Sequence, residues 1–391
     1  MSSLTHLGQY WSSRHREVRL LGVSDVGGPD GNGGGARGVA YDLDPFLALT
    51  GTRRRFRNDA AAAQEKDWSR ARWTYSALPF PTVELVELAE ATSCSVSEVA
   101  GEAFEAARSA GQPLELEELE RTPSATVDHL VAPIIPRRAQ GFGVTYLNSA
   151  LEREAEGSRS DYPYVYRSVK ENAERPELFF KATAGEHIVG PRGVMGLRRD
   201  LTNSSDMGRT ATPRVPVSAG IEPELAAVVY STGEIWGYTL ANDVSGNRLE
   251  NETLLYLTQA KHFTGALVLG PLIWLSNEQS NPCEAIRTRI LGSDGTVLFE
   301  HETNSERINS PLSQLIEWAK SHVQLHPGEV FSTGTDCVPD GAVKVLTEEH
   351  RVEISGPRIG TLRHGAGVVP EAGELNLDYS RLEYYGGLDG T

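Results

Sequence analysis

Short apolar stretches separated by turn residues dominate the chain after about residue 140. Four of them pair across Gly-containing turns and predict two β-hairpins, 222–230 with 234–240 and 285–291 with 296–302. Apolar stretches at 343–346 and 351–354 predict two further strands. Because long amphipathic helices do not alternate with these strands, the pattern favours a β-rich α+β domain over repeated βαβ units.

Apolar residues at helical spacing are confined to a few segments, which predict helices over 82–91, 95–110, 149–156 and 310–319. Ser95 and Glu98 have the spacing of a capping box at the start of the second segment. Ser310 is the expected N-cap of the last helix, and Pro311 is expected at its first helical position.

The N-terminal third of the chain differs from the rest. A glycine-rich run at 27–38 has GxGxxG spacing but leads into an apparent strand at 38–43, so it predicts a loop and not a dinucleotide fingerprint. The apolar, Pro-punctuated segment 131–136 is typical of an extended connector. We therefore predict a smaller α/β N-terminal domain over 1–135 and a larger catalytic domain over 136–391.

Composition narrows the class of protein. The 391 residues carry 37 Lys plus Arg and 53 Asp plus Glu, a net charge of −16, which argues against a general nucleic-acid or anionic-membrane binder. No apolar run approaches the ~18 residues of a membrane span. Cys94, Cys283 and Cys337 lie far apart and match no zinc or redox spacing. A reducing, cytoplasmic location is expected.

Nucleophile-elbow, phosphate-loop and HExxH motifs are missing, so carboxylates and lysines are the candidates for chemistry. On a strand, Glu222 and Glu224 would point to the same face, and a hairpin would return Asp243 to their neighbourhood. Three carboxylates without histidine suit a hard cation such as Mg²⁺, Mn²⁺ or Ca²⁺. The alternative is an exposed strand with solvated glutamates.

Two later segments could complete such a site. Lys261 precedes the apolar run 266–269 and could bind an anion or act as a base with a lowered pKa. The segment 332–335, which includes Gly334 and Thr335, could offer backbone N–H groups and hydroxyls to a carboxylate. Taken singly, an ordinary surface lysine and a plain turn explain these two segments better.

Together these segments resemble the fumarylacetoacetate hydrolase superfamily. Its ordered motifs are matched by Glu222-Pro-Glu224, Gly237-Tyr-Thr-Leu-Ala-Asn-Asp243-Val-Ser, Gln259-Ala-Lys261, Leu269-Gly-Pro271, Thr333-Gly-Thr335 and Ile359-Gly-Thr-Leu. The resemblance implies a mixed β-roll catalytic fold, a Mg²⁺-type ion held by Glu222, Glu224 and Asp243, and a homodimer or homotetramer.

Within the superfamily, the chain resembles the branch of 2-keto-3-deoxy-aldonate dehydratases. The supporting stretches are Gly143-Val-Thr-Tyr146, Arg175-Pro-Glu-Leu-Phe-Phe-Lys181 and Leu255-Tyr-Leu-Thr-Gln-Ala-Lys261. The resemblance implies that substrate is contacted by Tyr146, Lys181, Gln259, Gly334 and Thr335, and that Lys261 takes part in catalysis.

The expected lid helix departs from the pattern of many hydrolases in the superfamily. Their Tyr-x-x-His-x-x-Glu is here Tyr146-Leu-Asn-Ser149-Ala-Leu-Glu152. Because a serine does not activate water at neutral pH without help, Ser149 favours elimination over hydrolysis, with Glu152 as a candidate acid–base group. Asn247 also stands where the family commonly has an arginine.

The sequence thus predicts a metal-dependent hydro-lyase that dehydrates a small-molecule 2-keto sugar acid. It would convert a 2-keto-3-deoxypentonate to 2,5-dioxopentanoate through an enolate and loss of the C4 hydroxyl. Two alternatives stay open: a hydrolase that cleaves a C–C bond of a 2,4-diketo acid or acylpyruvate, and a non-catalytic metabolite-binding member of the superfamily.

Overall fold

The structure, a computed structural model, describes residues 3–15, 17–27, 37–47, 81–124, 126–155, 161–183, 187–198 and 219–368. Most of the strands in these ranges belong to one large mixed sheet, in the order β4-β3-β2-β1-β12-β11-β10-β15-β6-β7, with β5 on β1 and β8 on β12. Its strands are β1 (His6–Ser12), β2 (Glu17–Gly27), β3 (Arg37–Asp42), β4 (Leu114–Glu115), β5 (His129–Val131), β6 (Ala139–Gly143), β7 (Glu177–Ala182), β8 (Ile188–Val189), β10 (Pro223–Val229), β11 (Ile235–Asp243), β12 (Leu267–Leu275) and β15 (Glu329–Ser332).

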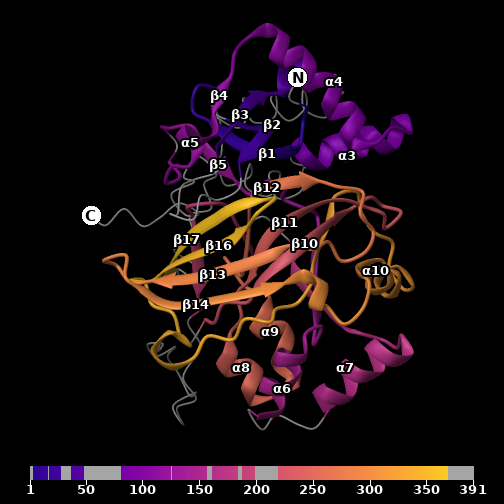
Figure 1. Ribbon diagram of the computed structural model, residues 1–391, viewed down its shortest axis with the longest axis vertical. Coiled ribbons are helices and arrows are strands. Elements are labelled where there is room, and N and C mark those ends of the chain that lie inside the picture. Colours follow the sequence, from indigo (N-terminus) through magenta and orange to yellow (C-terminus); the bar gives the residue numbers. More distant parts are fainter. Residues whose placement is uncertain are drawn as a thin grey trace, which may run out of the picture.

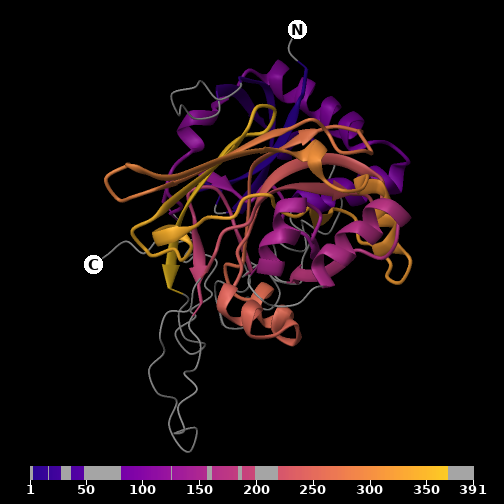
Figure 2. The ribbon, with the colours of Figure 1, turned by 60° about the horizontal axis from the view of Figure 1, so that its bottom comes forward.

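A smaller sheet lies against the large one. Its order is β14-β13-β16-β17-β9, from β9 (Val194–Leu197), β13 (Ala285–Leu291), β14 (Val297–Asn304), β16 (Arg351–Gly356) and β17 (Gly360–Val368). The β13–β14 hairpin extends from one side of the molecule in both views (Figures 1 and 2). This sheet confirms the second predicted hairpin.

The helices cover separate parts of the sheets. They are α3 (Pro81–Thr92), α4 (Val96–Ala110), α5 (Leu116–Leu119), α6 (Leu147–Ala155), α7 (Asp161–Asn172), α8 (Asn247–Glu252), α9 (Leu257–Lys261) and α10 (Leu312–Lys320), with single 3-10 turns at η1 (Asp44–Phe46), η3 (Leu254–Tyr256), η4 (Ser305–Arg307) and η5 (Gly341–Val343). Figure 1 shows α3 and α4 at one end, beside the N-terminal strands, and α6 to α9 at the other. No helix in the described ranges is both long enough and apolar enough to cross a bilayer.

The hairpin β10–β11 is the centre of the fold, since every residue in both strands is buried. Leu225, Ala227 and Leu240 face a core that includes the smaller sheet and α10. Ala226 and Ala241 face a second core formed with α3 and α4. Strand alternation therefore sends neighbouring residues of this hairpin to opposite layers.

The local signals for α4 are confirmed. The Ser95 hydroxyl accepts the Glu98 N–H, the Glu98 carboxylate accepts the Ser95 N–H, and Gly111 ends the helix in the left-handed conformation. Helix α10 begins one residue later than predicted. Pro311 is its N-cap because that residue has extended backbone (ψ 135°).

The strand predicted at 343–346 is wrong. The 3-10 turn η5 begins at Gly341, where φ is +56°, and ends at Val343, and no strand follows it at 344–346. Val343 and Leu346 are both buried. Their spacing of three residues fits a single helical turn, whereas a strand would send them to opposite faces. The strand predicted at 351–354 is present as β16.

The N-terminal segment joins the rest of the molecule through β1. His6 and Leu7 pair with Trp274 and Ile273 of β12, so one continuous sheet includes strands from both predicted domains. The strand expected at 38–43 is β3. The glycine-rich run lies largely outside the described residues, and the division at residues 135 and 136 stays a prediction.

Low pH should destabilise the contact between His6 of β1 and the turn between β16 and β17. His6 Nε2 donates to the Arg358 carbonyl at 2.5 Å, and burial lowers the pKa of His6 to about 4. Because the unfolded chain protonates histidine near pH 6.5, the contribution of His6 to stability is present above pH 6.5 and lost as the pH falls toward 4. The urea midpoint should be lower at pH 5 than at pH 7, and the loss should be smaller in His6→Gln. An equal loss in both proteins would contradict this assignment.

Candidate metal centre

Three carboxylates meet where β10 begins and β11 ends. Glu222 directly precedes β10, Glu224 is its second residue, and Asp243 is the last residue of β11. The Asp243 N–H donates to the Glu222 carbonyl at 2.9 Å, so these two residues face each other across the hairpin. Carboxylate oxygens of all three lie within 4.8 Å of one another. The hairpin therefore brings together the three predicted metal ligands.

Lys261, at the end of α9, lies against two of these carboxylates. Its Nζ donates to Glu222 Oε2 at 2.5 Å and to Ser245 Oγ at 2.6 Å, and lies 3.4 Å from Asp243 Oδ2. The ammonium also lies 5.1 Å from the centre of the Phe179 ring, within cation–π range. Lys261 is nearly fully buried and is thus a constituent of the site and not a surface lysine.

Lys181, on β7, is the second cation of the site. It is fully buried, forms an ion pair with Asp243 Oδ1, and donates to the Val244 carbonyl at 2.6 Å. Burial lowers the pKa of Lys181, and the Asp243 carboxylate opposes that shift. Lys181 therefore holds one oxygen of Asp243 by an ion pair that solvent does not reach.

Glu224 is held by a turn from a distant part of the chain. The Gly334 N–H donates to Glu224 Oε2 at 2.9 Å. Gly334 has φ +88°, and a Cβ there would lie 1.9 Å from Thr145 Oγ1, so this position requires glycine. Burial raises the pKa of Glu224 well above its ordinary range, and the carboxylates of Asp243 and Glu222 raise it further.

The charges of this cluster favour a divalent cation. Two ammonium groups and three carboxylates give 2 − 3 = −1. Glu250 Oε1, 3.8 Å from Lys261 Nζ, makes the surroundings more acidic still. A bound divalent ion would make the inner cluster +1 and would reverse the forces that raise the carboxylate pKa values. The donor set contains only carboxylate oxygens, which fits Mg²⁺, Mn²⁺ or Ca²⁺.

The predicted substrate residues lie at varied distances from this centre. Tyr146 is buried, and burial together with the Glu224 carboxylate raises the pKa of its hydroxyl. The Thr335 hydroxyl donates to the Pro223 carbonyl at 2.8 Å, beside the strand that carries Glu224. Gln259 is exposed on α9, where its carbonyl accepts a hydrogen bond from Arg198. Of these three, Tyr146 and Thr335 border the carboxylates.

The predicted lid helix is present as α6, which begins directly after Tyr146. Ser149 is half-buried in its first turn. Glu152 belongs to the same helix, but its side chain lies outside the described part of the structure. The Asn247 side chain accepts the Gly220 N–H at 3.1 Å. Asn247 therefore holds the backbone just before β10 in place.

Sequence reasoning missed four buried polar neighbours of the carboxylates: Asn242, Ser245, Glu250 and His364. Asn242 and Ser245 flank Asp243 and could have been found by asking which residues satisfy buried polar groups beside a ligand. His364 is 121 residues away from Asp243 in the sequence, and no local pattern connects it to the site.

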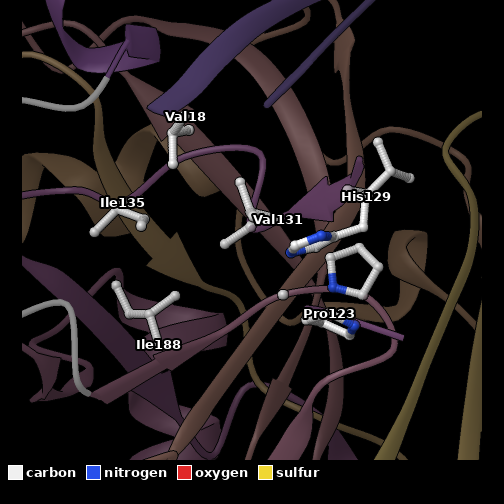
Figure 3. Close-up of a pocket in the computed structure, with 10 residues that line it drawn as sticks. Val18, Pro123, His129, Val131, Ile135 and Ile188 are labelled. Atoms are coloured by element: carbon white, nitrogen blue, oxygen red, sulfur yellow. The ribbon is translucent and has the colours of Figure 1, made fainter. Parts of the chain in front are cut away.

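A separate apolar pocket lies between the N-terminal segment and β8. Figure 3 shows Val18, Pro123, His129, Val131, Ile135 and Ile188 around it. None of the described residues that line it is one of the carboxylates or lysines of the metal centre. Its mostly aliphatic walls give it no means of holding a cation, so we place the candidate active site at the carboxylates.

The described residues thus form a β-rich α+β fold with three clustered carboxylates at one end of a hairpin in the large mixed sheet. A family model described as "Fumarylacetoacetate (FAA) hydrolase C-terminal" matches residues 167–366, about half of the chain. The chain belongs to the fumarylacetoacetate hydrolase family, which confirms the resemblance inferred from the ordered motifs.

Two relatives carry the names of dehydratases. The chain is 34% identical over 239 residues to the 2-dehydro-3-deoxy-D-arabinonate dehydratase of Saccharolobus solfataricus, covering 60% of this chain and 72% of that protein. It is 33% identical over 242 residues to the probable 2-keto-3-deoxyxylonate dehydratase of Haloferax volcanii, covering 62% and 76%.

A solved structure shares the fold. The 2-keto-3-deoxy-D-arabinonate dehydratase complexed with magnesium and 2,5-dioxopentanoate superposes with a TM-score of 0.58 at 24% identity, covering 94% of this chain and 100% of that one. The likeness extends over the N-terminal segment as well as the catalytic strands, and confirms the predicted fold class.

Replacing Lys181 tests the ion pair at the centre. Lys181→Met should lower the free energy of unfolding by about 3 kcal/mol in the presence of chelator, because Asp243 keeps a buried charge with one partner fewer. Added Mg²⁺ should restore part of the loss, since a cation that binds only the folded state stabilises it. Urea unfolding with and without Mg²⁺ measures both effects.

Lys320→Met is the matched control, because Lys320 pairs with Glu317 on the exposed side of α10. Its cost should stay within about 1 kcal/mol and should not depend on Mg²⁺. Equal losses in the two variants would contradict a buried ion pair at Lys181.

Proposed function

We propose that this protein is a metal-dependent hydro-lyase that dehydrates a 2-keto-3-deoxy sugar acid, with a 2-keto-3-deoxypentonate converted to 2,5-dioxopentanoate. The observation that carries the proposal is the cluster of Glu222, Glu224 and Asp243 with Lys181 and Lys261. It lies in a chain that is 33–34% identical to two proteins named as dehydratases of such acids.

Glu222, Glu224 and Asp243 would hold the cation, with Mg²⁺ as the proposed ion and Mn²⁺ or Ca²⁺ as alternatives. The bound ion would polarise the 2-keto acid and stabilise the negative charge that develops when a proton leaves C3. A dehydratase named for a pentonate of this class has been solved with magnesium and 2,5-dioxopentanoate, which supports this choice.

The chain's own residues would then orient the substrate. With the ion bound, the cluster would have a charge of +1 and would attract a substrate with one negative charge. The buried Lys261 ammonium lies beside the cluster and would bind the carboxylate of the substrate. Tyr146 and Thr335 border the same space, and Lys181 keeps Asp243 in one orientation. Gly334 acts on Glu224 and, through it, on the cation.

The reaction removes a C3 proton and the C4 hydroxyl as one molecule of water, after which the double bond shifts to give the C5 aldehyde. Ser149 in the first turn of α6 lacks the basicity to activate water for hydrolysis at neutral pH, which supports elimination. Glu152 on the same helix is proposed as the group that moves a proton between carbon and the departing hydroxyl.

The proposal includes a homodimer or homotetramer that works in the cytoplasm. Light scattering on the purified protein measures the assembly. If the protein is a monomer and is active, the proposed oligomer is wrong and the proposed dehydration still stands.

The proposed activity is tested with stereoisomers of 2-keto-3-deoxypentonate in the presence of Mg²⁺, by following 2,5-dioxopentanoate. Product should form with at least one isomer, and excess chelator should abolish it. Glu222→Gln should lower kcat/KM by ~100-fold or more, because the loss of outer-shell groups alone costs about 10–100-fold at metal sites.

Glu317→Gln is the control, since that carboxylate lies on the exposed side of α10 and should leave activity unchanged. Release of pyruvate from an acylpyruvate, with no dehydration of any isomer, would replace the proposal by the diketo-acid hydrolase. Absence of both activities and of Mg²⁺ binding would favour a non-catalytic metabolite-binding protein.

A further inference from the structure

Asn242 directly precedes the metal-ligand candidate Asp243 and lies opposite Pro223 of β10, but its side chain points to the other face of the hairpin. Glu224, Ala226, Ala241 and Asp243 share one face of the β10–β11 hairpin, so alternation sends Asn242 to the opposite face, toward the smaller sheet. Asn242 is fully buried. A buried amide must find partners on that side, because an unpaired amide removed from water destabilises the folded state.

Two of its three partners connect the smaller sheet to a metal ligand; the third is Met195 Sδ of β9, which lies 3.7 Å from Asn242 Nδ2. Asn242 Nδ2 lies 3.1 Å from His364 Nε2, and Asn242 Oδ1 accepts the backbone N–H of Glu222 at 2.9 Å. His364 belongs to β17, on the same face as Leu362 and Ala366 of the core between the sheets. One imidazole thus reaches the backbone of Glu222 through a single side chain.

The hydrogen-bond pattern admits one arrangement of protons. His364 Nδ1 lies 2.9 Å from the Gly365 carbonyl, which can only accept, so Nδ1 carries the proton and Nε2 is an acceptor. Nε2 therefore takes the Asn242 amide N–H, which turns the amide oxygen toward Glu222. Burial lowers the pKa of His364 to about 4, so the imidazole stays neutral near pH 7.

Glu222 needs such an anchor more than the other two ligands do. Its side chain is 18% exposed, whereas Asp243 is fully buried against Lys181, and Glu224 is buried with the Gly334 N–H on its carboxylate. Glu222 also precedes Pro223, which has no N–H and adds no backbone donor to the ladder. The N–H accepted by Asn242 and the carbonyl that accepts the Asp243 N–H fix the Glu222 backbone on both sides.

We propose that His364 is a positioning residue of the metal centre: through Asn242 it fixes the backbone of Glu222, and so couples the smaller sheet to the affinity for the cation. The inference rests on the proposed function only in assuming that the three carboxylates bind a divalent ion. It assigns His364 no contact with substrate.

Calorimetric titration with Mg²⁺ in the absence of substrate tests this coupling in the full-length protein. His364→Leu should weaken Mg²⁺ binding about tenfold, the lower end of the effect of outer-shell partners on metal affinity. His364→Gln, which keeps an acceptor at similar reach, should recover most of that affinity. The matched control is His129→Leu, because His129 is equally buried but lies on β5, in the N-terminal segment.

The outcomes distinguish failure of the positioning role of His364 from failure of the proposed function. His129→Leu should lower stability and leave the Kd for Mg²⁺ within about twofold of the unmodified protein. If His364→Leu and His129→Leu bind Mg²⁺ equally well, the positioning role is overturned while the proposed function stands. If the unmodified protein binds neither Mg²⁺ nor Mn²⁺, the proposed function itself fails.

If His364→Leu does not fold, a second variant tests the same positioning role. His364→Met fills the same volume with a flexible side chain that cores tolerate well. It should show the same loss of Mg²⁺ affinity against His129→Met. Unchanged affinity in a folded His364→Met would also overturn the proposal.

Discussion

The close approach of three carboxylates, two of them buried, at one end of a hairpin is the constraint on which the rest of the structure depends. Glu224 and Asp243 are almost completely removed from water, so burial raises the pKa of both carboxyl groups, and the neighbouring Glu222 carboxylate raises both further. Such a cluster persists only with compensating positive charge. Lys181 and Lys261 supply part of it, and the remaining deficit of one charge is what a divalent cation would more than offset.

The fold provides this compensation from distant parts of the chain. Lys181 lies on β7, Lys261 lies at the end of α9, and the Gly334 N–H belongs to the turn after β15. The central hairpin receives them on the face that carries the carboxylates, while its other face packs on the smaller sheet and α10. The strict alternation of a strand therefore places the carboxylates on the face whose alanines, Ala226 and Ala241, pack with α3 and α4, and sends Leu225 and Leu240 to the core with the smaller sheet.

Much of this arrangement could be predicted from the sequence, because it depends on local geometry. The i, i+2 spacing of Glu222 and Glu224 and the length of the hairpin indicate that Asp243 can lie near them. The same spacing also fits solvated glutamates, so the assignment of all three as ligands depended on the resemblance to the superfamily. The capping box of α4 is equally local. The segment 343–346 was predicted wrongly because apolar residues three apart in a short stretch fit either a strand or a turn.

Long-range partners could not be predicted in the same way. The pairing of Lys181 with Asp243 depends on β7 and β11, which are not neighbours in the sheet, and His364 reaches Asn242 from another sheet. No spacing in the sequence encodes either contact. The apolar pocket of Figure 3 likewise forms only where the N-terminal segment meets β8.

The most direct test of the account is a crystal structure of the protein with Mn²⁺, phased for its anomalous signal. The account predicts one strong anomalous peak within coordination distance of Glu222, Glu224 and Asp243, with the Lys261 ammonium moved away from Glu222. A map with no peak there, and with Lys261 still bridging Glu222 and Ser245, would contradict a cation site at this cluster.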